Sequence, residues 1–228
     1  MPIVAQIEQA LFQLAPKDLA FDWDNVGHLE GSPDQEVQRV LVALDVTENV
    51  VSEAEKLGCQ LIVSHHPLMN VRWHQAEMQT LRPDRYLGRL LRRLVKADIS
   101  VISMHTNLDI APGGVNDALM AVLGAEVTGG LEPSGTDDDG SALTCGRVGR
   151  LPEPMALSDF LPYVADRLHA NGLRYVDGGR PVQKFAVCGG SGGGDKKAAG
   201  SGGGSADGAK ISMILKTTSA EYWQYVQA

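Results

Sequence analysis

The feature that most constrains the fold of this chain is a short stretch, Leu61 to Leu68, in which an apolar run ends in two adjacent histidines and a proline. A brief run of β-prone residues bounded by a turn signal favours a strand. Pro67 lacks the N–H that a central strand needs in order to continue, so the chain must leave the sheet there. His65 and His66 are therefore predicted at the carboxyl end of a buried strand.

A second β-rich run repeats this pattern. Ile99 to Met104 ends at His105, and Asp109 follows shortly after. A strand from Val40 to Leu44 and a helix closed by Gly58 come before the histidine pair, which makes a βαβ unit with parallel strands. Parallel strands end at the same edge of a sheet, where open α/β folds place their ligands. We therefore expect an α/β fold with the three histidines and Asp109 along one edge.

Two helices complete the overlapping βαβ units. Thr47 is predicted to cap the first, and the second is predicted from Tyr86 to Val95. The second helix has leucines on one side and basic residues on the other. Long basic side chains commonly cover the outer face of a helix, so we interpret this face as solvated rather than as a phosphate site.

The carboxy-terminal half has weaker patterns. Thr128 to Ser141 is rich in Gly, Pro, Ser and Asp and is predicted to be an exposed loop. A strand from Leu143 to Leu151, a helix capped by Ser158 and a strand from Phe185 to Cys188 are expected after it. Ten of the twenty residues from Gly189 to Gly208 are glycine, which predicts a flexible linker.

Composition excludes several classes of protein. The hydrophobic fraction of 43% over 228 residues is ordinary for a globular protein, and the net charge of −8 gives no general footprint for nucleic acid or an anionic membrane. No signal peptide and no run of membrane-spanning length is recognised. The three cysteines are far apart and form no CxxC pair, so neither a disulfide framework nor a thiolate metal site is indicated. A cytoplasmic location is expected.

The histidines and the carboxylate suit a divalent metal. Neutral imidazole and carboxylate together bind zinc, iron or manganese, and the residues do not distinguish among these ions. An isolated His-His pair would more often be one core and one exposed histidine, but the second strand end, with His105 and Asp109, reverses that preference. The competing interpretation, Ser64 as a nucleophile beside His65, lacks a nucleophile-elbow motif and an orienting acid in recognisable order.

Five motifs in the chain match those of a known family. The chain resembles the NIF-three-like proteins, a dinuclear-metal group often named as GTP cyclohydrolase type 2 homologues. The resemblance covers residues 1–193, without the inserted domain of longer members. It rests on Trp23-Asp24-Asn25-Val26-Gly27, Leu44-Asp45-Val46-Thr47, Ser64-His65-His66-Pro67-Leu68, His105-Thr106-Asn107-Leu108-Asp109 with Pro112-Gly113-Gly114-Val115-Asn116-Asp117, and Val187-Cys188-Gly189-Gly190-Ser191-Gly192-Gly193.

The resemblance implies a fold, a ligand set and an assembly. The implied fold is α/β, with two intertwined halves and mixed, largely parallel sheets. His65, His66 and Asp109 are implied as metal ligands, with two divalent ions per chain in the family. Asp45 and His105 match motif positions near the site. The implied assembly is a toroidal homohexamer.

The chain also departs from the family. Such proteins complete the site with a carboxy-terminal His-x-x-x-Glu segment, but here no histidine follows His169. Residues 194–208 are expected to be a flexible segment and 209–228 a non-matching tail. His28, where the family pattern has an aliphatic residue, and Glu221 are candidate substitute ligands.

Two function classes follow. The first is a metal-dependent hydrolase, GTP cyclohydrolase type 2-like, that acts on a nucleotide or related small molecule. The second is a non-catalytic metal-binding or regulatory assembly protein. The expected partners are a small-molecule substrate and further copies of the chain, with no membrane and no nucleic acid.

Overall fold

A computed structural model describes residues 1–69, 80–136 and 140–190. The chain divides into two compact units, Met1–Leu108 and Asp109–Ala228. Among the described residues, no helix has the length and apolar character needed to cross a bilayer.

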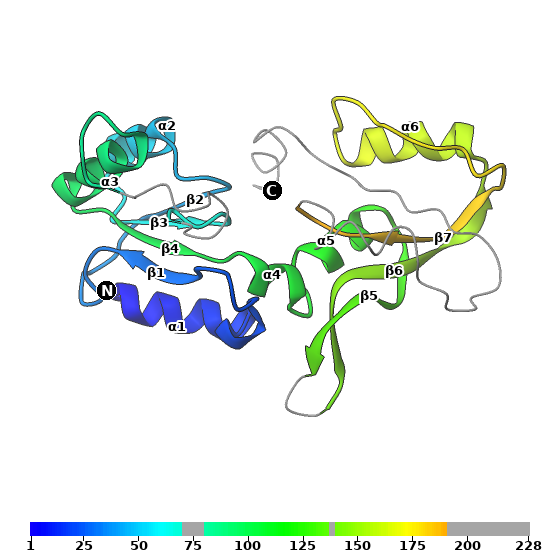
Figure 1. Ribbon diagram of the computed structural model, residues 1–228, viewed down its shortest axis with the longest axis horizontal. Coiled ribbons are helices and arrows are strands. Elements are labelled where there is room, and N and C mark those ends of the chain that lie inside the picture. Colours follow the sequence, from blue (N-terminus) through cyan, green and yellow to red (C-terminus); the bar gives the residue numbers. More distant parts are fainter. Residues whose placement is uncertain (70–79, 137–139, 191–228) are drawn as a thin grey trace. The chain divides into compact units, whose positions relative to one another are not determined.

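The first unit is built on a four-stranded mixed sheet. Its strands are β1 (Gly27–Glu30), β2 (Val40–Ala43), β3 (Leu61–Ser64) and β4 (Ser100–Ser103), in the order β1-β4-β3-β2. The pairs β2–β3 and β3–β4 are parallel, as the βαβ pattern predicts, and β1 pairs antiparallel with β4. Helix α1 (Val4–Leu14) lies on one face, and α2 (Glu48–Leu57) and α3 (Tyr86–Ala97) lie on the other (Figure 1). A short 3-10 helix, Lys17–Leu19, follows α1.

The ends of α2 confirm two sequence predictions. Thr47 is the N-cap, and its side chain accepts a hydrogen bond from the Val50 N–H at 3.2 Å. Gly58 ends the helix in the left-handed region at φ 64°, which glycine adopts without a steric penalty. The apolar sides of α2 and α3 then close over the sheet, and the buried core between them includes Val51, Ala54, Ile62, Leu90, Leu94 and Val101.

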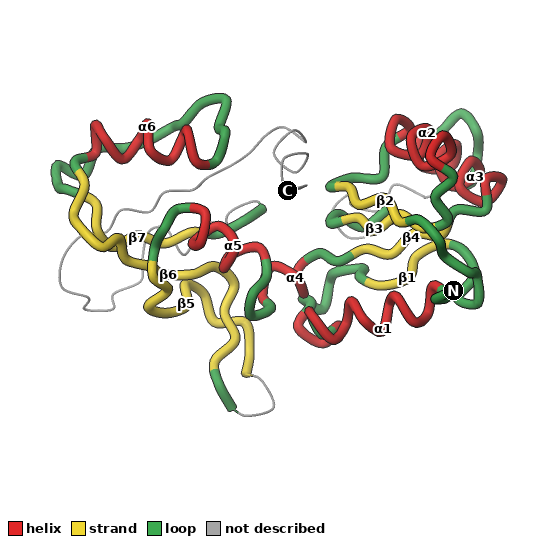
Figure 2. The backbone as a smooth tube through the Cα atoms, turned by 180° about the vertical axis from the view of Figure 1, so that it is seen from behind, coloured by secondary structure: helices red, strands yellow, loops and turns green. Residues whose placement is uncertain are grey.

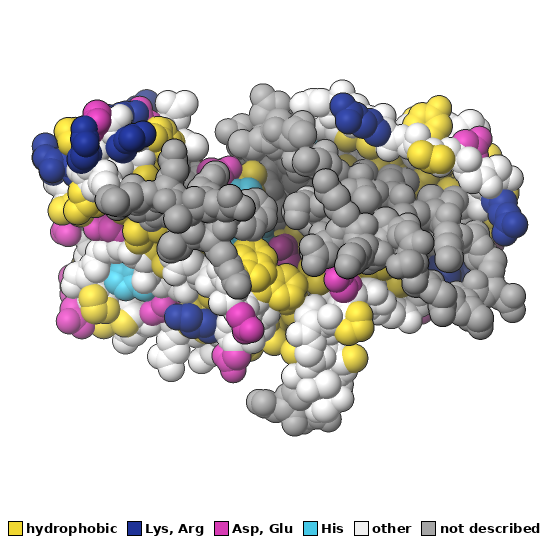
Figure 3. Space-filling view, in the orientation of Figure 1, with side chains coloured by type: hydrophobic (Ala, Val, Ile, Leu, Met, Phe, Trp, Pro, Cys, Tyr) yellow, Lys and Arg dark blue, Asp and Glu magenta, His cyan; other side chains and the backbone are white. Residues whose placement is uncertain are grey.

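The basic face of α3 is solvated, as predicted. Arg89 pairs with Glu48 at 2.7 Å and Arg93 hydrogen bonds to Glu55, so both arginines tie α3 to α2. Lys and Arg side chains gather over these two helices in the space-filling view (Figure 3). Because the pairs are partly exposed to solvent, each contributes little to stability.

The second unit contains an antiparallel sheet. Its strands are β5 (Glu126–Thr136), β6 (Ala142–Met155) and β7 (Val182–Val187), in the order β5-β6-β7. Among the described residues, parallel pairing therefore occurs only in the first unit. Helix α4 (Thr106–Ile110) spans the division between the units, and α5 (Val115–Val122) and α6 (Leu157–Arg167) precede and follow the long β5–β6 hairpin (Figure 2). Phe160 of α6 packs against Phe185 of β7, with ring centroids 5.5 Å apart.

Two local predictions in this unit are wrong. The described part of the segment predicted as an exposed loop, Thr128 to Ser141, is largely exposed as expected, but residues 128–136 belong to strand β5. Edge strands tolerate proline and glycine, because one side of their backbone makes no ladder bonds, and Pro133 sits in such a strand. Helix α6 is capped by Ala156 and not by Ser158, and no side-chain hydrogen bond closes its first turn.

Candidate metal centre

The three predicted histidines converge. His65 and His66 follow β3 directly, and His105 lies just beyond β4. Ser64 is in register with Ser103, so the two strands end side by side. One potential ligand atom from each histidine lies within 4.8 Å of those of the other two. The ring centroids are 5.1 Å apart for His65–His66 and for His65–His105, and 5.6 Å for His66–His105.

Backbone hydrogen bonds fix His65 and His66, although both residues lie beyond the end of strand β3. The N–H groups of His65 and His66 donate to the carbonyls of Ala43 and Leu44, at 3.1 and 2.9 Å. The buried Ser64 hydroxyl donates to the His66 carbonyl at 2.9 Å and lies 2.8 Å from the Ser103 hydroxyl. Ser64 therefore fixes the turn that follows the strand, which gives it a structural role in place of the nucleophile alternative.

The Nδ1 atom of each imidazole lies next to an oxygen that can only accept a hydrogen bond. Nδ1 must then carry the proton, which leaves the lone pair on Nε2. Neutral histidine in this tautomer is the usual metal ligand, and a carboxylate or carbonyl partner of this kind typically orients it. The Nδ1 partners are Met104 O for His65 at 2.9 Å, Asp45 Oδ1 for His66 at 2.7 Å and Asp24 Oδ1 for His105 at 2.8 Å.

Asp24 is a site residue that the sequence interpretation missed. We interpreted its loop as a turn, and Asp24 does accept a hydrogen bond from the Asn25 N–H at 2.8 Å. Its buried carboxylate also accepts hydrogen bonds from His105 Nδ1 and from the Thr106 backbone and hydroxyl. Burial by itself would raise the pKa of Asp24, but these hydrogen bonds bring that pKa down to about 2. The Trp-Asp-Asn-Val-Gly motif was the one sequence signal that could have pointed to this role of Asp24, because 81 positions separate Asp24 from His105.

The electrostatics favour an uncharged imidazole at His65. Burial, together with the neighbouring His105 and His66, lowers the pKa of His65 to about 3, so this ring is neutral at pH 7. The hydrogen bond with His66 lowers the pKa of Asp45, which therefore stays ionised and able to accept.

Asp109 opens the second unit, and its role as a ligand stays a prediction. It is buried, and its backbone carbonyl accepts a hydrogen bond from the Asn116 side chain at 2.8 Å. The Asn116 side-chain oxygen in turn accepts from the Gly189 N–H at 2.9 Å. One asparagine thus joins the predicted ligand segment to the glycine motif after β7.

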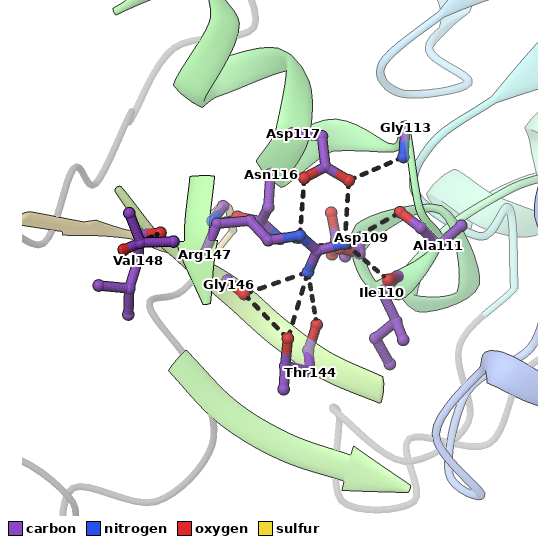
Figure 4. A network of polar contacts seen from close by, with 12 residues as sticks. Asp109, Ile110, Ala111, Gly113, Asn116, Asp117, Thr144, Gly146, Arg147 and Val148 are labelled. Carbon is purple, nitrogen blue, oxygen red and sulfur yellow. Dashed lines mark hydrogen bonds and ion pairs between the residues drawn. The ribbon is translucent and has the colours of Figure 1, made fainter. Parts of the chain in front are cut away.

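Arg147 organises the chain that follows Asp109 (Figure 4). Its buried guanidinium pairs with Asp117 through Nε at 2.7 Å and Nη2 at 3.0 Å. Asp117 also accepts from the Gly113 N–H at 2.7 Å. The same guanidinium donates to four backbone carbonyls, those of Ile110, Ala111, Thr144 and Gly146.

One of the two suggested substitute ligands, His28, does not join the cluster. Within the described ranges, the group able to hold a metal comprises His65, His66 and His105. His28 lies on β1, where it pairs with Ile102. Glu221 lies outside the described residues.

The fold and the histidine cluster define a class of α/β proteins with a histidine-lined centre at the end of a parallel sheet. The profile of the Duf34/NIF3 (NGG1p interacting factor 3) family matches residues 2–203, and the chain belongs to this family. The resemblance inferred from the motifs is thereby confirmed.

Curated relatives carry a consistent name. The chain is 38% identical over 195 residues to a GTP cyclohydrolase 1 type 2 homolog of Streptomyces coelicolor and 34% identical over 180 residues to that of Clostridium perfringens. These alignments cover 84% and 78% of this chain. The chain spans just under two thirds of the length of these relatives, 66% in both cases.

Solved structures confirm the α/β fold class. A hypothetical protein of Staphylococcus aureus aligns with a TM-score of 0.74 at 30% identity, covering 83% of this chain and 72% of that one. A Bacillus cereus protein related to NIF3 aligns with a TM-score of 0.74 at 25% identity, covering 83% and 77%.

Proposed function

We propose that His65, His66 and His105 hold a divalent metal ion, and that the chain is a metal-dependent hydrolase acting on a nucleotide or a related small molecule. The observation that carries the metal site is the shared tautomer, because all three Nδ1 atoms face acceptors and each Nε2 keeps the lone pair that a metal needs. The substrate class is supported by the name GTP cyclohydrolase 1 type 2 homolog carried by the relatives.

The donor set fits a borderline ion such as zinc, iron or manganese. Three neutral imidazoles suit these ions, and a fourth position would remain for water or substrate. A divalent ion bound there would act as a Lewis acid and lower the pKa of a coordinated water. We propose Asp109 as a further ligand, as the family resemblance implies. We expect one ion to bind and a second to bind weakly or not at all, because few carboxylates are available to offset the repulsion between two ions.

The chain's own residues differ in access to solvent, which suggests how they divide the work. The side chains of His105 and Asp24 are 11% and 0% exposed, whereas those of His66 and Asp45 are 43% and 42% exposed. The buried pair, His105 and Asp24, is suited to holding one metal-ligating imidazole rigidly. The second pair lies where a substrate can approach, so Asp45 both orients His66 and can accept a proton from a group bound there.

The test is metal content per chain on protein purified without added metal, followed by turnover of GTP and other nucleotides. His66→Ala and His105→Ala should each lower metal content sharply, because each removes a large share of the first coordination shell. His28→Ala is the matched control, since it removes a histidine outside the cluster. Unchanged metal content in both cluster variants would refute the site.

Asp109→Ala tests the proposed carboxylate ligand separately. A fall in stoichiometry comparable to that of His66→Ala would support its assignment. Full metal loading without hydrolysis of any nucleotide would favour the alternative function, a non-catalytic metal-binding or regulatory assembly protein.

We also propose that the chain self-associates, in the hexamer that the family resemblance implies. Light scattering over a range of concentrations is the direct measurement. A monomer at every concentration would contradict this assembly.

A further inference from the structure

Two of the three cysteines meet in the second unit, although 43 residues separate them in sequence. Cys145 lies on β6 and Cys188 directly follows β7, and these strands are antiparallel neighbours. Their Sγ atoms are 3.9 Å apart, and both thiols are free. The sequence interpretation found no indication of a disulfide, because such a pairing across a sheet leaves no CxxC signature.

The two thiols differ in their surroundings. Cys145 is buried, whereas Cys188 is partly exposed. The hydrogen bond between them raises the pKa of Cys145 and lowers the pKa of Cys188. Cys188 is therefore the thiol that reacts first with a reagent from solvent, and Cys145 is held against it as a second thiol.

The local backbone allows the sulfurs to approach. Gly146 follows Cys145 with φ 80°, and a Cβ at this position would lie 2.7 Å from the Val187 carbonyl oxygen. Glycine thus permits a close crossing of the two strands at this point. A disulfide requires the sulfurs to move from 3.9 Å to about 2.0 Å, which a local adjustment beside a glycine can supply.

A thiolate metal site is the competing use of such a pair. Zinc in a structural site takes a full tetrahedral set of ligands. Among the described residues, no third Cys, His, Asp or Glu ligand atom joins these two sulfurs within ligating distance. A dithiol without further donors is better suited to oxidation than to holding an ion.

We propose that Cys145 and Cys188 are a reversible oxidation site, in which a peroxide converts the two thiols into an intramolecular disulfide. The Cys188 thiolate attacks one peroxide oxygen, the O–O bond breaks, and the sulfur becomes a sulfenic acid as hydroxide leaves and takes up a proton to form water. Cys145 then attacks that sulfur and loses its proton, the S–O bond breaks, and a second water leaves. Two thiols are oxidised and one hydrogen peroxide is reduced to two waters.

The test uses the full chain and hydrogen peroxide. After an acid quench, the denatured protein is alkylated with one reagent, reduced, and alkylated with a second, and the peptides are identified by mass spectrometry. We expect two of the three cysteines to lose the first label, and a peptide that links Cys145 to Cys188. Dithiothreitol should restore both thiols, while the buried Cys59 serves as the internal control.

Variants separate the roles of the two thiols. Cys59→Ser should leave the linked peptide unchanged, whereas Cys145→Ser should abolish it and leave Cys188 as a sulfenic acid. The linked peptide in the unsubstituted chain decides the proposal even if a variant fails to fold. Three outcomes would overturn it: both thiols still open to alkylation, chains linked to one another through Cys188, or Cys188 oxidised directly to a sulfinic acid.

Discussion

The two units fix their polar clusters by different means. In the first, the backbone ladder of parallel strands carries three histidines to one edge, and a single acceptor orients each ring. In the second, one buried side chain, Arg147, ties Ile110 and Ala111, which belong to no strand, to strand β6. The histidine cluster is supported by regular backbone, so it should tolerate the loss of one hydrogen-bond acceptor behind a ring. The cluster in the second unit depends on a single buried cation, so it should not tolerate the loss of Arg147.

The largest expected effect is therefore in the second unit. Arg147→Met should lower the free energy of unfolding by about 3–5 kcal/mol, because the partly buried Asp117 loses its charged partner and four backbone carbonyls lose a hydrogen-bond donor. Urea denaturation measures this loss. Arg150→Met is the matched control on the same strand, since Arg150 is exposed and its guanidinium donates to the Gln183 side chain. If Arg147→Met changed the free energy of unfolding by less than about 1 kcal/mol, the proposed difference between the two units would be wrong.

The next prediction concerns the acceptors behind the histidines. Asp24→Asn should weaken metal binding by roughly 10–100-fold, because the substitution removes the charge that orients His105 in a buried setting. Asp45→Asn should cost less, since Asp45 and His66 are both substantially solvent-exposed. Competition with a chromophoric chelator measures both affinities. Equal losses of metal affinity in the two variants would show that the burial of a carboxylate does not determine how strongly it supports its histidine.

The convergence of the histidines was predictable because it follows from local rules. The segment from Val40 to Ser64 alternates strand, helix and strand within a short span, and parallel pairing then fixes which ends meet. The position of His105 follows by the same rule from the second, overlapping βαβ unit. This part of the fold and of the candidate site is encoded by short-range patterns.

The features that were missed depend on contacts between residues far apart in sequence. Asp24 meets His105 across 81 residues, and Cys145 meets Cys188 across 43. Strand β5 has no apolar alternation and forms because β6 supplies hydrogen-bonding partners along its length. Tertiary pairing of this kind leaves no trace in the pattern of a single segment.

The smallest expected effect lies at the edge of the first unit, in Glu30 of β1. Burial, and secondarily the nearby Asp98, raise the pKa of Glu30 from its ordinary 4.5 to about 7. Between these two values the folded chain binds the proton more tightly than the unfolded chain, so this group lowers stability as the pH rises through the window. Below pH 4.5 both states are protonated and the penalty is absent; above about pH 7 it is complete.

Glu30→Gln removes that penalty because glutamine cannot ionise. The variant should be more stable than the parent at about pH 8, by about 1 kcal/mol or less, since the side chain is only partly buried and solvent screens its charge. The gain should shrink as the pH falls and vanish near pH 4.5. Thermal unfolding of the two proteins over this pH range measures the difference. A gain that does not change with pH would mean that packing, and not ionisation, distinguishes the two side chains, and that the edge of this sheet carries no electrostatic cost.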